Sequence, residues 1–398
     1  MKVPTTRWQH VFLVGCILLI ALNLRPAVTA LAPLAERMHG DGLSREMIGA
    51  MTTVPLLLFG IAGMWAGWLG GRFGLARSLG AGLLLIAAGC FVRSVPEFDF
   101  QGWRFVGTIL IGAGIALGNV LMPGLVKSRY PDKVGPLTSL YSTAMNLGAA
   151  LGIAVAVPLA NWLSGGWNAS ISAWGYFAAV TVVFWLPQML PAPVARPRLA
   201  HPLAGVIALT RQVRAWQVAA FMGLQSSVFY SAVAWLPTVL QVRGMTETEA
   251  AGWVSTMQIL GCGASLLIPT LAGRLRSQSG WIAATALLNV FCLFGILFLP
   301  KVGVGVAVIG FGLGVNASFG LALLIIALRS RDSETAANLS AMAQSVGYLL
   351  AAPGPWIVGW LSEATGSWNP AIGFVVLLAL GAAIFGWLAG REGELSAA

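Results

Sequence analysis

The sequence has 398 residues, of which 58% are hydrophobic and only 9% are charged, and its mean hydropathy is +0.82. Soluble globular domains carry about 25% charged residues, so this composition excludes a water-soluble enzyme, and the high hydrophobicity excludes a disordered chain. The formal net charge is +10, but the basic residues fall in small groups between long apolar runs. That distribution does not favour a nucleic-acid-binding protein. It predicts an all-α integral membrane protein.

A helix needs about 20 mostly apolar residues to cross a bilayer. Twelve such runs follow one another, near residues 10–35, 47–70, 78–96, 103–126, 136–158, 171–190, 215–240, 249–272, 280–299, 302–328, 336–360 and 371–389. A polar, proline-rich stretch separates the sixth run from the seventh. We therefore expect a six-helix half over residues 1–190, a cytoplasmic linker over residues 191–214 and a second six-helix half over residues 215–398.

The basic residues provide a test of this count, because cytoplasmic loops carry the excess of Lys and Arg. With the N-terminus inside, 16 of the 23 basic residues fall in inner loops, 6 fall in outer loops, and Arg25 lies within the first run. The alternation predicts twelve spans with both termini in the cytoplasm. The alternative for the first run is a cleavable signal peptide ending near Ala32, which would leave eleven spans.

Landmarks recur between the two sets of runs. Gly71-Arg72 follows the second run and Gly273-Arg274 follows the eighth, 202 residues later. The basic pair around Ser128 and the pair around Ser330, after the fourth and tenth runs, have the same offset. Since both halves start inside, the repeat is parallel, as in transporters built from two six-helix halves related by an axis along the membrane normal.

Arg25 is the one basic residue that lies well inside a predicted span rather than near its end. It lies about 22 Å along the first helix, where a guanidinium facing lipid would cost at least ~2.5–3.5 kcal/mol. All thirteen Asp and Glu residues fall at span ends or in loops, so we expect Arg25 to face a central cavity and to bind an anionic or electron-rich group through its planar fork. Pro26 removes a helix hydrogen bond beside it. The structural alternative is that Arg25 extends to the membrane surface or pairs with Glu36.

Other polar residues inside spans are further candidates for the site. We expect substrate binding from Arg25, Asn23, Thr29, Asn119, Gln225 and Tyr230. A second group could line the cavity: Tyr141, Asn146, Trp235, Gln258, Asn316, Gln344 and Tyr348. For any single member, hydrogen bonding between helices is the alternative role.

The four cysteines and three histidines form no cluster with metal-ligand spacing, and we expect neither a metal nor another cofactor. No nucleophile–base set is visible that would support a membrane enzyme. The expected partners are a small-molecule substrate and the lipid bilayer, with no nucleic acid, and the chain is expected to be a monomer.

Several segments resemble the cyanate and 2-nitroimidazole transporter family (CynX/NimT) of the major facilitator superfamily. They are Asn23-Leu-Arg-Pro-Ala27 with Pro33-Leu34, Gly118-Asn-Val-Leu121 with Pro123, and Phe221-Met-Gly-Leu-Gln-Ser226 running to Trp235-Leu-Pro237. The resemblance implies a bacterial inner-membrane carrier that works by alternating access. It leaves two substrate classes open: a cyanate-like small anion, or an exported nitroimidazole-type or other small aromatic drug.

The loop after the second run departs from the superfamily pattern. Arg72 stands at a basic position of the pattern and Arg77 follows directly after the pattern, and both are expected to act in gating. Gly71 stands where the pattern has an acid. An acid-based latch at this loop is therefore in doubt. Proton coupling commonly uses a buried carboxylate, and no predicted span contains one.

Overall fold

The computed structural model describes residues 7–43, 45–95, 102–190 and 203–395, and within them the chain is helical, with no strand. The elements of the N-terminal half are α1 (Arg7–Asn23), α2 (Pro26–Thr29), η1 (Ala32–Leu34), α3 (Ala35–Gly40), α4 (Arg45–Phe73), α5 (Leu75–Ser94), α6 (Gly102–Arg129), η2 (Pro131–Lys133), α7 (Val134–Trp162) and α8 (Gly166–Met189). Helix formation satisfies the backbone polar groups internally, which is obligatory in lipid.

The short α9 (Ala204–Thr210) precedes the C-terminal half. The elements of that half are α10 (Val213–Val242), α11 (Glu247–Ala272), α12 (Ser279–Phe298), α13 (Lys301–Leu328), α14 (Ser333–Ala351), α15 (Pro353–Thr365) and α16 (Trp368–Ala389). The predicted linker thus contains a helix in its second part, and its residues 191–202 lie outside the described residues.

Eleven helical segments of the described chain are long and apolar enough to cross a membrane. The remaining span, the eleventh in chain order, is formed by α14 and α15, which are broken at Ala352, directly before Pro353. Most of the polar side chains that lower the hydropathy of α14, among them Asn338, Gln344 and Ser345, are buried in the protein rather than facing lipid. The predicted all-α fold of twelve transmembrane helices is therefore confirmed.

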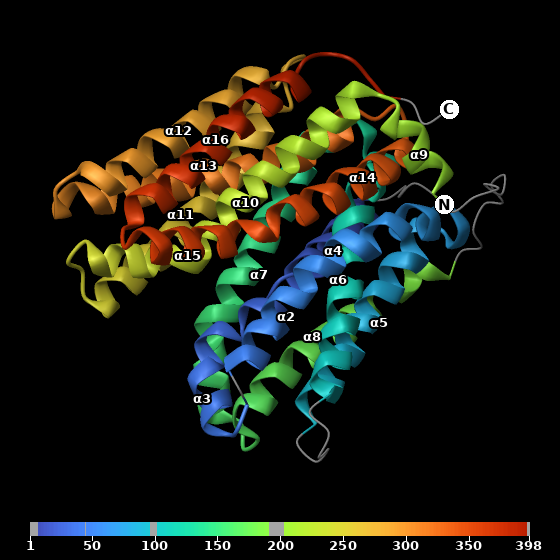
Figure 1. Cartoon of the computed structure of the whole chain (residues 1–398). Coiled ribbons are helices and arrows are strands. Elements are labelled where there is room, and N and C mark those ends of the chain that lie inside the picture. The colour runs from blue at the N-terminus through green and yellow to red at the C-terminus, as the bar shows by residue number, and fades with distance from the viewer. Residues whose placement is uncertain (1–6, 44, 96–101, 191–202, 396–398) are drawn as a thin grey trace.

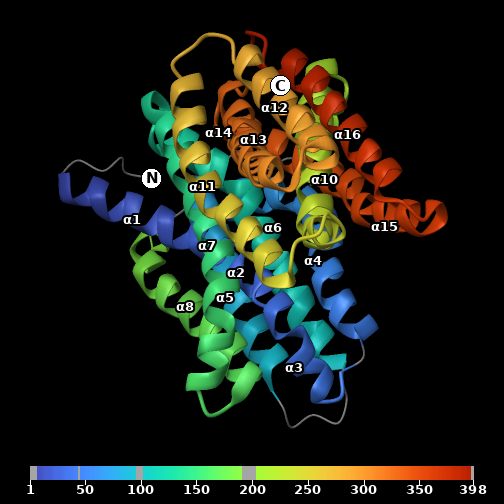
Figure 2. The ribbon, with the colours of Figure 1, turned by 90° about the vertical axis from the view of Figure 1, so that its left-hand side faces the viewer.

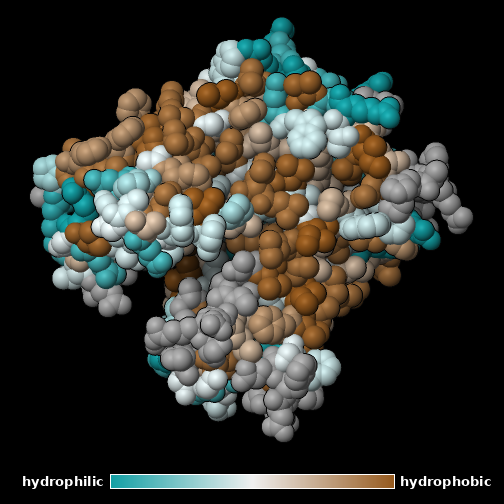
Figure 3. Space-filling model, in the orientation of Figure 1, coloured by the Kyte–Doolittle hydropathy of each residue, from teal (hydrophilic) through white to brown (hydrophobic). Residues whose placement is uncertain are grey.

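The most deeply buried spans are α6 and α13, which occupy equivalent places in the two halves. In the most apolar window of each, 83% and 89% of residues are buried, against 22–61% in the other candidate spans. Large apolar side chains such as Phe291, Phe298 and Val306 lie instead on the outside. Figure 3 shows this apolar surface as a brown belt between more polar ends, as expected for a protein that lipid surrounds.

The two halves meet on one side of the molecule and separate on the other (Figure 1). We call the side that carries Arg7, α9 and Leu395 the terminal side, and the side that carries α3 and the start of α11 the far side. On the terminal side, the backbones of Gly135 in α7 and Gly273 in α11 approach so closely that a methyl group on Gly273 would lie 3.0 Å from the Cα of Gly135. On the far side, the surface is hollowed between the halves (Figure 3).

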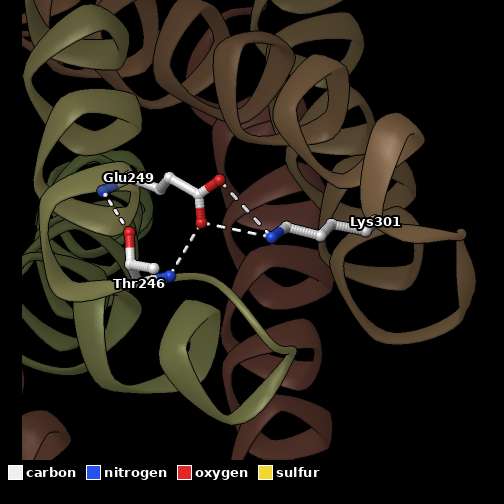
Figure 4. A network of polar contacts seen from close by, with 3 residues as sticks. All are labelled: Thr246, Glu249 and Lys301. Atoms are coloured by element: carbon white, nitrogen blue, oxygen red, sulfur yellow. Dashed lines mark hydrogen bonds and ion pairs between the residues drawn. The ribbon is translucent and has the colours of Figure 1, made fainter.

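A polar network fixes the far-side start of α11 (Figure 4). The hydroxyl of Thr246 accepts a hydrogen bond from the Glu249 amide at 3.2 Å, and the Thr246 amide donates to Glu249 Oε2 at 2.8 Å. This reciprocal pair is a capping box. Lys301 at the start of α13 lies 3.1 Å from the same carboxylate oxygen. The network therefore joins two neighbouring helices of the C-terminal half.

Candidate functional site

The first span is broken in its middle. Helix α1 ends at Asn23 and α2 begins at Pro26, which has no amide proton to continue the helical ladder. The Leu24 amide bonds instead to the carbonyl of Ala21 at 3.2 Å, which is a tighter turn. Arg25 stands at this break, so its side chain leaves the helix where the backbone changes direction.

Helix α7 holds the break through two glycines. A methyl group on Gly148 would lie 2.5 Å from the carbonyl oxygen of Leu22, and one on Gly152 would lie 2.8 Å from the Cα of Pro26 and collide with the hydroxyl of Thr29. Real Cβ atoms do not approach this closely. The Gly148-x-x-x-Gly152 pair therefore forms a seat that only glycine can provide without displacing the first span, which we call the glycine seat.

The guanidinium of Arg25 lies against aromatic rings of the other half. Its Cζ is 4.6 Å from the ring centre of Phe319 in α13 and 5.4 Å from that of Phe229 in α10. Cation–π contacts of this kind contribute about 0.5–2 kcal/mol each, depending on desolvation. Among the side chains that the structure describes, no carboxylate pairs with Arg25, so its positive charge is uncompensated within the described protein.

A small cavity lies beside Arg25 between the two halves. Its walls are formed by Arg25, Asn146, Gln225, Ser226, Phe229, Tyr230, Asn316, Phe319 and Tyr348. The first span and α7 contribute the N-terminal half's residues, and α10, α13 and α14 contribute the rest. The cavity volume is about 10 Å³, which is room for about one water molecule. A larger solute therefore requires some of these side chains to move.

Amide groups at this cavity have spare hydrogen-bonding capacity. Neither Asn146 Nδ2 nor Gln225 Oε1 has a hydrogen-bond partner among the described residues. Gln225 Nε2 donates to the Met222 carbonyl at 3.1 Å, which orients the free oxygen. A buried polar atom without a partner costs about 1–3 kcal/mol, and a bound solute can recover that cost. The cavity thus combines a cation, aromatic rings and unsatisfied amides.

Six of the predicted residues meet at this cavity: Arg25, Asn146, Gln225, Tyr230, Asn316 and Tyr348. Gln258 lies directly behind it, where its side-chain oxygen accepts a hydrogen bond from Asn316 Nδ2 at 3.2 Å. The ring centres of Tyr230 and Tyr348 are 6.3 Å apart. Tyr141 in α7 is almost fully buried, with 1% of its surface exposed, and does not line the cavity.

Three other predicted residues make structural hydrogen bonds away from the cavity. The amide of Asn23 donates to the hydroxyl of Thr181 in α8 at 2.9 Å. Thr29 donates to the carbonyl of Ala149 at 3.1 Å, next to the glycine seat. The indole of Trp235 donates to the carbonyl of Pro355 at 2.7 Å. Each of these bonds joins two helices, which is the alternative role that the sequence left open.

Asn119 and Gln344 meet at the interface between the halves. Gln344 Nε2 in α14 donates to the backbone carbonyl of Asn119 in α6 at 2.8 Å. Nearby on the terminal side, Gly67 of α4 lies so close to α14 that a methyl group there would meet the side-chain oxygen of Asn338 at 2.6 Å. These contacts keep the halves together from the cavity to the terminal side.

The two residues expected to act in gating lie on either side of the short connection between α4 and α5. The guanidinium of Arg72 lies 5.3 Å from the Trp68 ring of its own helix. Arg77 Nε donates to the carbonyl of Met189 at the end of α8, at 3.0 Å. Nothing lies within 4 Å of a methyl group placed on Gly71. These contacts are within the N-terminal half, and the gating role stays a prediction.

Sequence reasoning missed three residues that shape the site. Phe229 and Phe319 flank Arg25, but phenylalanines in apolar spans carry no signal that distinguishes them from core residues. Arg93, counted among the outer-loop cations, is fully buried in α5, and its Nη2 donates to the carbonyl of Ala27 at 2.5 Å. In a regular helix the amide of Leu31 would donate to the carbonyl of Ala27, but here it donates to the carbonyl of Val28.

The comparisons with known proteins agree with this architecture. Residues 11–352 match the model of the Major Facilitator Superfamily. The chain is 40% identical to the "Uncharacterized transporter YycB" of Bacillus subtilis (strain 168), over 96% of this chain and 94% of that protein. It is 39% identical to the "2-nitroimidazole transporter" of Escherichia coli (strain K12), over 97% of both.

A more distant relative is the "Cyanate transport protein CynX" of Escherichia coli (strain K12), at 25% identity over 92% of this chain and 94% of that protein. Among solved structures, the E. coli fucose:proton symporter FucP superposes with a TM-score of 0.77 at 15% identity, over 96% of this chain and 99% of that chain. A family match over most of the length, two relatives near 40% identity and a twelve-helix fold agree. The chain belongs to the major facilitator superfamily, a family of multi-pass membrane transporters rather than enzymes, with cyanate and 2-nitroimidazole transporters among its relatives.

Proposed function

We propose that this protein moves a small planar solute that carries a nitro or carboxylate group across the bacterial inner membrane by alternating access, with both termini in the cytoplasm. The observation that carries the proposal is the position of Arg25 between two aromatic rings at the interface of the halves, with no carboxylate partner among the side chains that the structure describes. The 39% identity to a 2-nitroimidazole transporter supports it.

The chemistry of the cavity suits that class of solute. Nitro and carboxylate groups are both planar and present two oxygens, which match the fork of a guanidinium. The rings of Phe229, Phe319 and Tyr230 offer faces and edges for a second flat ring. Asn146 Nδ2 supplies an additional donor for an oxygen, and Gln225 Oε1 supplies an acceptor for a ring N–H.

Alternating access needs a site that can open to each side in turn. In this structure the halves touch on the terminal side and are separated by a hollow on the far side (Figures 1 and 3). The cavity holds only about one water molecule, so a ring enters when Tyr230 or Tyr348 swings aside. Such a movement couples solute binding to the contact between the halves.

The second candidate is a cyanate-like small anion. The observation that favours it is the small cavity volume, about 10 Å³, which a linear three-atom anion disturbs less than a ring does. The uncompensated charge of Arg25 suits either solute. The two candidates differ in one respect: a ring-shaped solute stacks on the aromatic rings beside Arg25, whereas a linear anion does not.

Transport assays with the purified full-length protein in proteoliposomes test the proposal. The solutes are 2-nitroimidazole, benzoate and cyanate, with imidazole as the matched compound that lacks the two-oxygen group. We expect saturable transport of 2-nitroimidazole or benzoate and none of imidazole. Transport of cyanate alone would support the second candidate, and equal transport of imidazole would contradict a role for the two-oxygen group. Counterflow assays on vesicles that contain the protein in each of its two orientations measure the direction of transport.

A pair of phenylalanine variants separates the candidates further. Phe319→Leu removes a ring beside Arg25, whereas Phe298→Leu changes a side chain that is 71% exposed on the outer surface of α12. An aromatic pair contributes about 0.5–1.5 kcal/mol beyond its buried area, so we expect Phe319→Leu to weaken the affinity for an aromatic solute about 2- to 12-fold. Phe298→Leu should change it little. Equal effects of the two variants would contradict stacking at Phe319.

A further inference from the structure

We infer that a groove on the terminal side, between the start of α1 and the turn that joins α6 to α7, binds the phosphate of an anionic phospholipid. The groove encloses about 990 Å³, and Arg7, Arg129 and Lys133 line it together with the apolar side chains of Val14 and Leu137. It lies apart from the cavity at Arg25, and the inference does not depend on the identity of the transported solute.

The groove lies at the border of the membrane. Within the described residues, the first candidate span starts at Arg7, the span of α6 ends at Arg129, and the next span begins at Pro131. Three span ends therefore meet around it, at the depth of lipid headgroups. Figure 2 shows the first turns of α1 at the edge of the bundle.

The charges around the groove favour an anion. Arg7 and Lys133 are exposed, and Arg129 is 6% exposed with its Nη2 donating to Gln188 Oε1 at 3.3 Å. The one acid that lines the groove is Asp132, so three basic groups face one acidic group. Near a membrane surface, each basic residue attracts an anionic lipid by about 1 kcal/mol, which is roughly fivefold in affinity.

The walls of the groove are held in place by contacts between α1 and the turn. The rings of His10 and Tyr130 lie 5.8 Å apart, and the Tyr130 hydroxyl donates to the His10 carbonyl at 3.4 Å. The basic groups are therefore presented by segments that pack against each other, rather than by two independent flexible ends.

The polarity of the groove changes with depth in the direction that a lipid requires. Val11 and Val14 lie about 6 and 10 Å further along α1 than Arg7, and Leu137 lies one turn beyond Lys133 in α7. The exposed basic groups, Arg7 and Lys133, are at the rim, and the apolar groups lie further along the helices. A phospholipid has a matching arrangement, with a charged headgroup followed by apolar acyl chains. A soluble phosphate has no apolar part that could contact the apolar wall.

The test measures lipid binding to the purified full-length protein in neutral detergent. Phosphatidylglycerol and phosphatidylcholine, which share acyl chains and differ in charge, are titrated and the bound lipid is counted by native mass spectrometry. Inorganic phosphate and glycerol phosphate are the soluble probes. The variant is Arg7→Gln with Lys133→Gln, and the matched control is Arg274→Gln with Arg276→Gln, two exposed arginines after α11 on the same side.

We expect the wild-type protein to prefer phosphatidylglycerol and the Arg7/Lys133 variant to lose about 10- to 30-fold in affinity, while the Arg274/Arg276 control keeps it. Thermal unfolding of both variants establishes that they fold. Equal loss in the control would overturn the site, because it would indicate only a general charge effect. Equal binding of the two lipids, or tight binding of soluble phosphate, would also overturn it.

Discussion

The buried guanidinium of Arg93 takes the place of a missing backbone donor: its Nη2 lies 2.5 Å from the carbonyl oxygen of Ala27, whose usual helical partner, the amide of Leu31, bonds elsewhere. The other guanidinium nitrogens of Arg93 have no hydrogen-bond partner among the described residues. A cation buried in this way costs several kcal/mol. The contact holds α2 in the conformation that places Arg25 at the break.

Replacing Arg93 separates the stability of the fold from the geometry of the site. Arg93→Met removes a hydrogen bond from a charged donor, worth about 1.5–3 kcal/mol, but also removes the larger cost of the buried charge. We therefore expect the Tm in detergent to stay constant or rise, while the affinity for solute falls. A lower Tm with unchanged affinity would indicate that Arg93 only anchors α5.

Arg25 is the residue on which transport should depend most. We expect Arg25→Ala to abolish transport while membrane abundance stays near normal, because the side chain faces a cavity rather than a packed core. Arg25→Lys should restore activity only partly, since an ammonium is a point charge without the planar fork. Initial rates of solute transport measure both. Unchanged kinetics in Arg25→Ala would reject the site.

The glycine seat gives a prediction about stability. Gly148→Ala places a methyl group 2.5 Å from the Leu22 carbonyl, so the first span must shift, at a cost of about 1–3 kcal/mol. The matched control is Gly263→Ala, where nothing lies within 4 Å of the added methyl group. Thermal unfolding in detergent compares them. We expect a lower Tm for Gly148→Ala alone, and similar Tm values would contradict the seat.

Gln344 should influence the balance between the two open states. Gln344→Leu removes the 2.8 Å hydrogen bond to the Asn119 carbonyl, which is worth about 0.5–1.5 kcal/mol and shifts a two-state equilibrium about 2- to 12-fold. We expect the terminal side to open more often. Distances between spin labels at positions 73 and 276, measured by pulsed EPR in a background without native cysteines, report the opening. Gln241→Leu, at an exposed site in α10, is the control.

The capping box at Thr246 predicts a pH dependence. The Thr246 amide, and then the Lys301 ammonium, hold the pKa of the Glu249 carboxyl below its usual range. A lowered pKa in the folded state means that the carboxylate stabilises the fold at neutral pH and that this contribution is lost as the pH falls through the lowered value. We expect Glu249→Gln to have a slightly lower Tm than wild type at pH 7. The difference should shrink as the pH falls below about 4.3, the ordinary pKa of Glu, and disappear below the lowered pKa of the folded state. A difference that persists at low pH would contradict it.

The sequence predicts the number and order of the spans because hydrophobic length and the distribution of basic residues are local properties. Pro26 also indicates where the first span weakens. The break between α14 and α15 was not predicted, since the window 336–360 reads as one apolar run. What the sequence lacks is the rotation of each helix relative to its neighbours. Asn23 and Arg25 are two residues apart, yet one bonds to α8 and the other faces the cavity.

Pairings across the halves were beyond prediction for the same reason. Phe319 lies almost 300 positions from Arg25, and nothing in either segment indicates that they meet. Asn119 was expected to bind substrate and Gln344 to line the cavity, but the two contact each other at the interface. Polar residue type identifies candidates, whereas packing decides which candidates face a solute.

The charge of Arg25, which no carboxylate in the described part of the chain compensates, also has an electrical consequence. A monovalent anion bound there would neutralise the site, so the loaded carrier would reorient without moving net charge while the empty carrier would not. The membrane potential acts on each elementary charge that crosses it with about 2.3 kcal/mol per 100 mV. For an anionic solute, the membrane potential would therefore affect only the step in which the empty protein returns. For a neutral nitro compound, it would affect the reorientation of both the loaded and the empty protein.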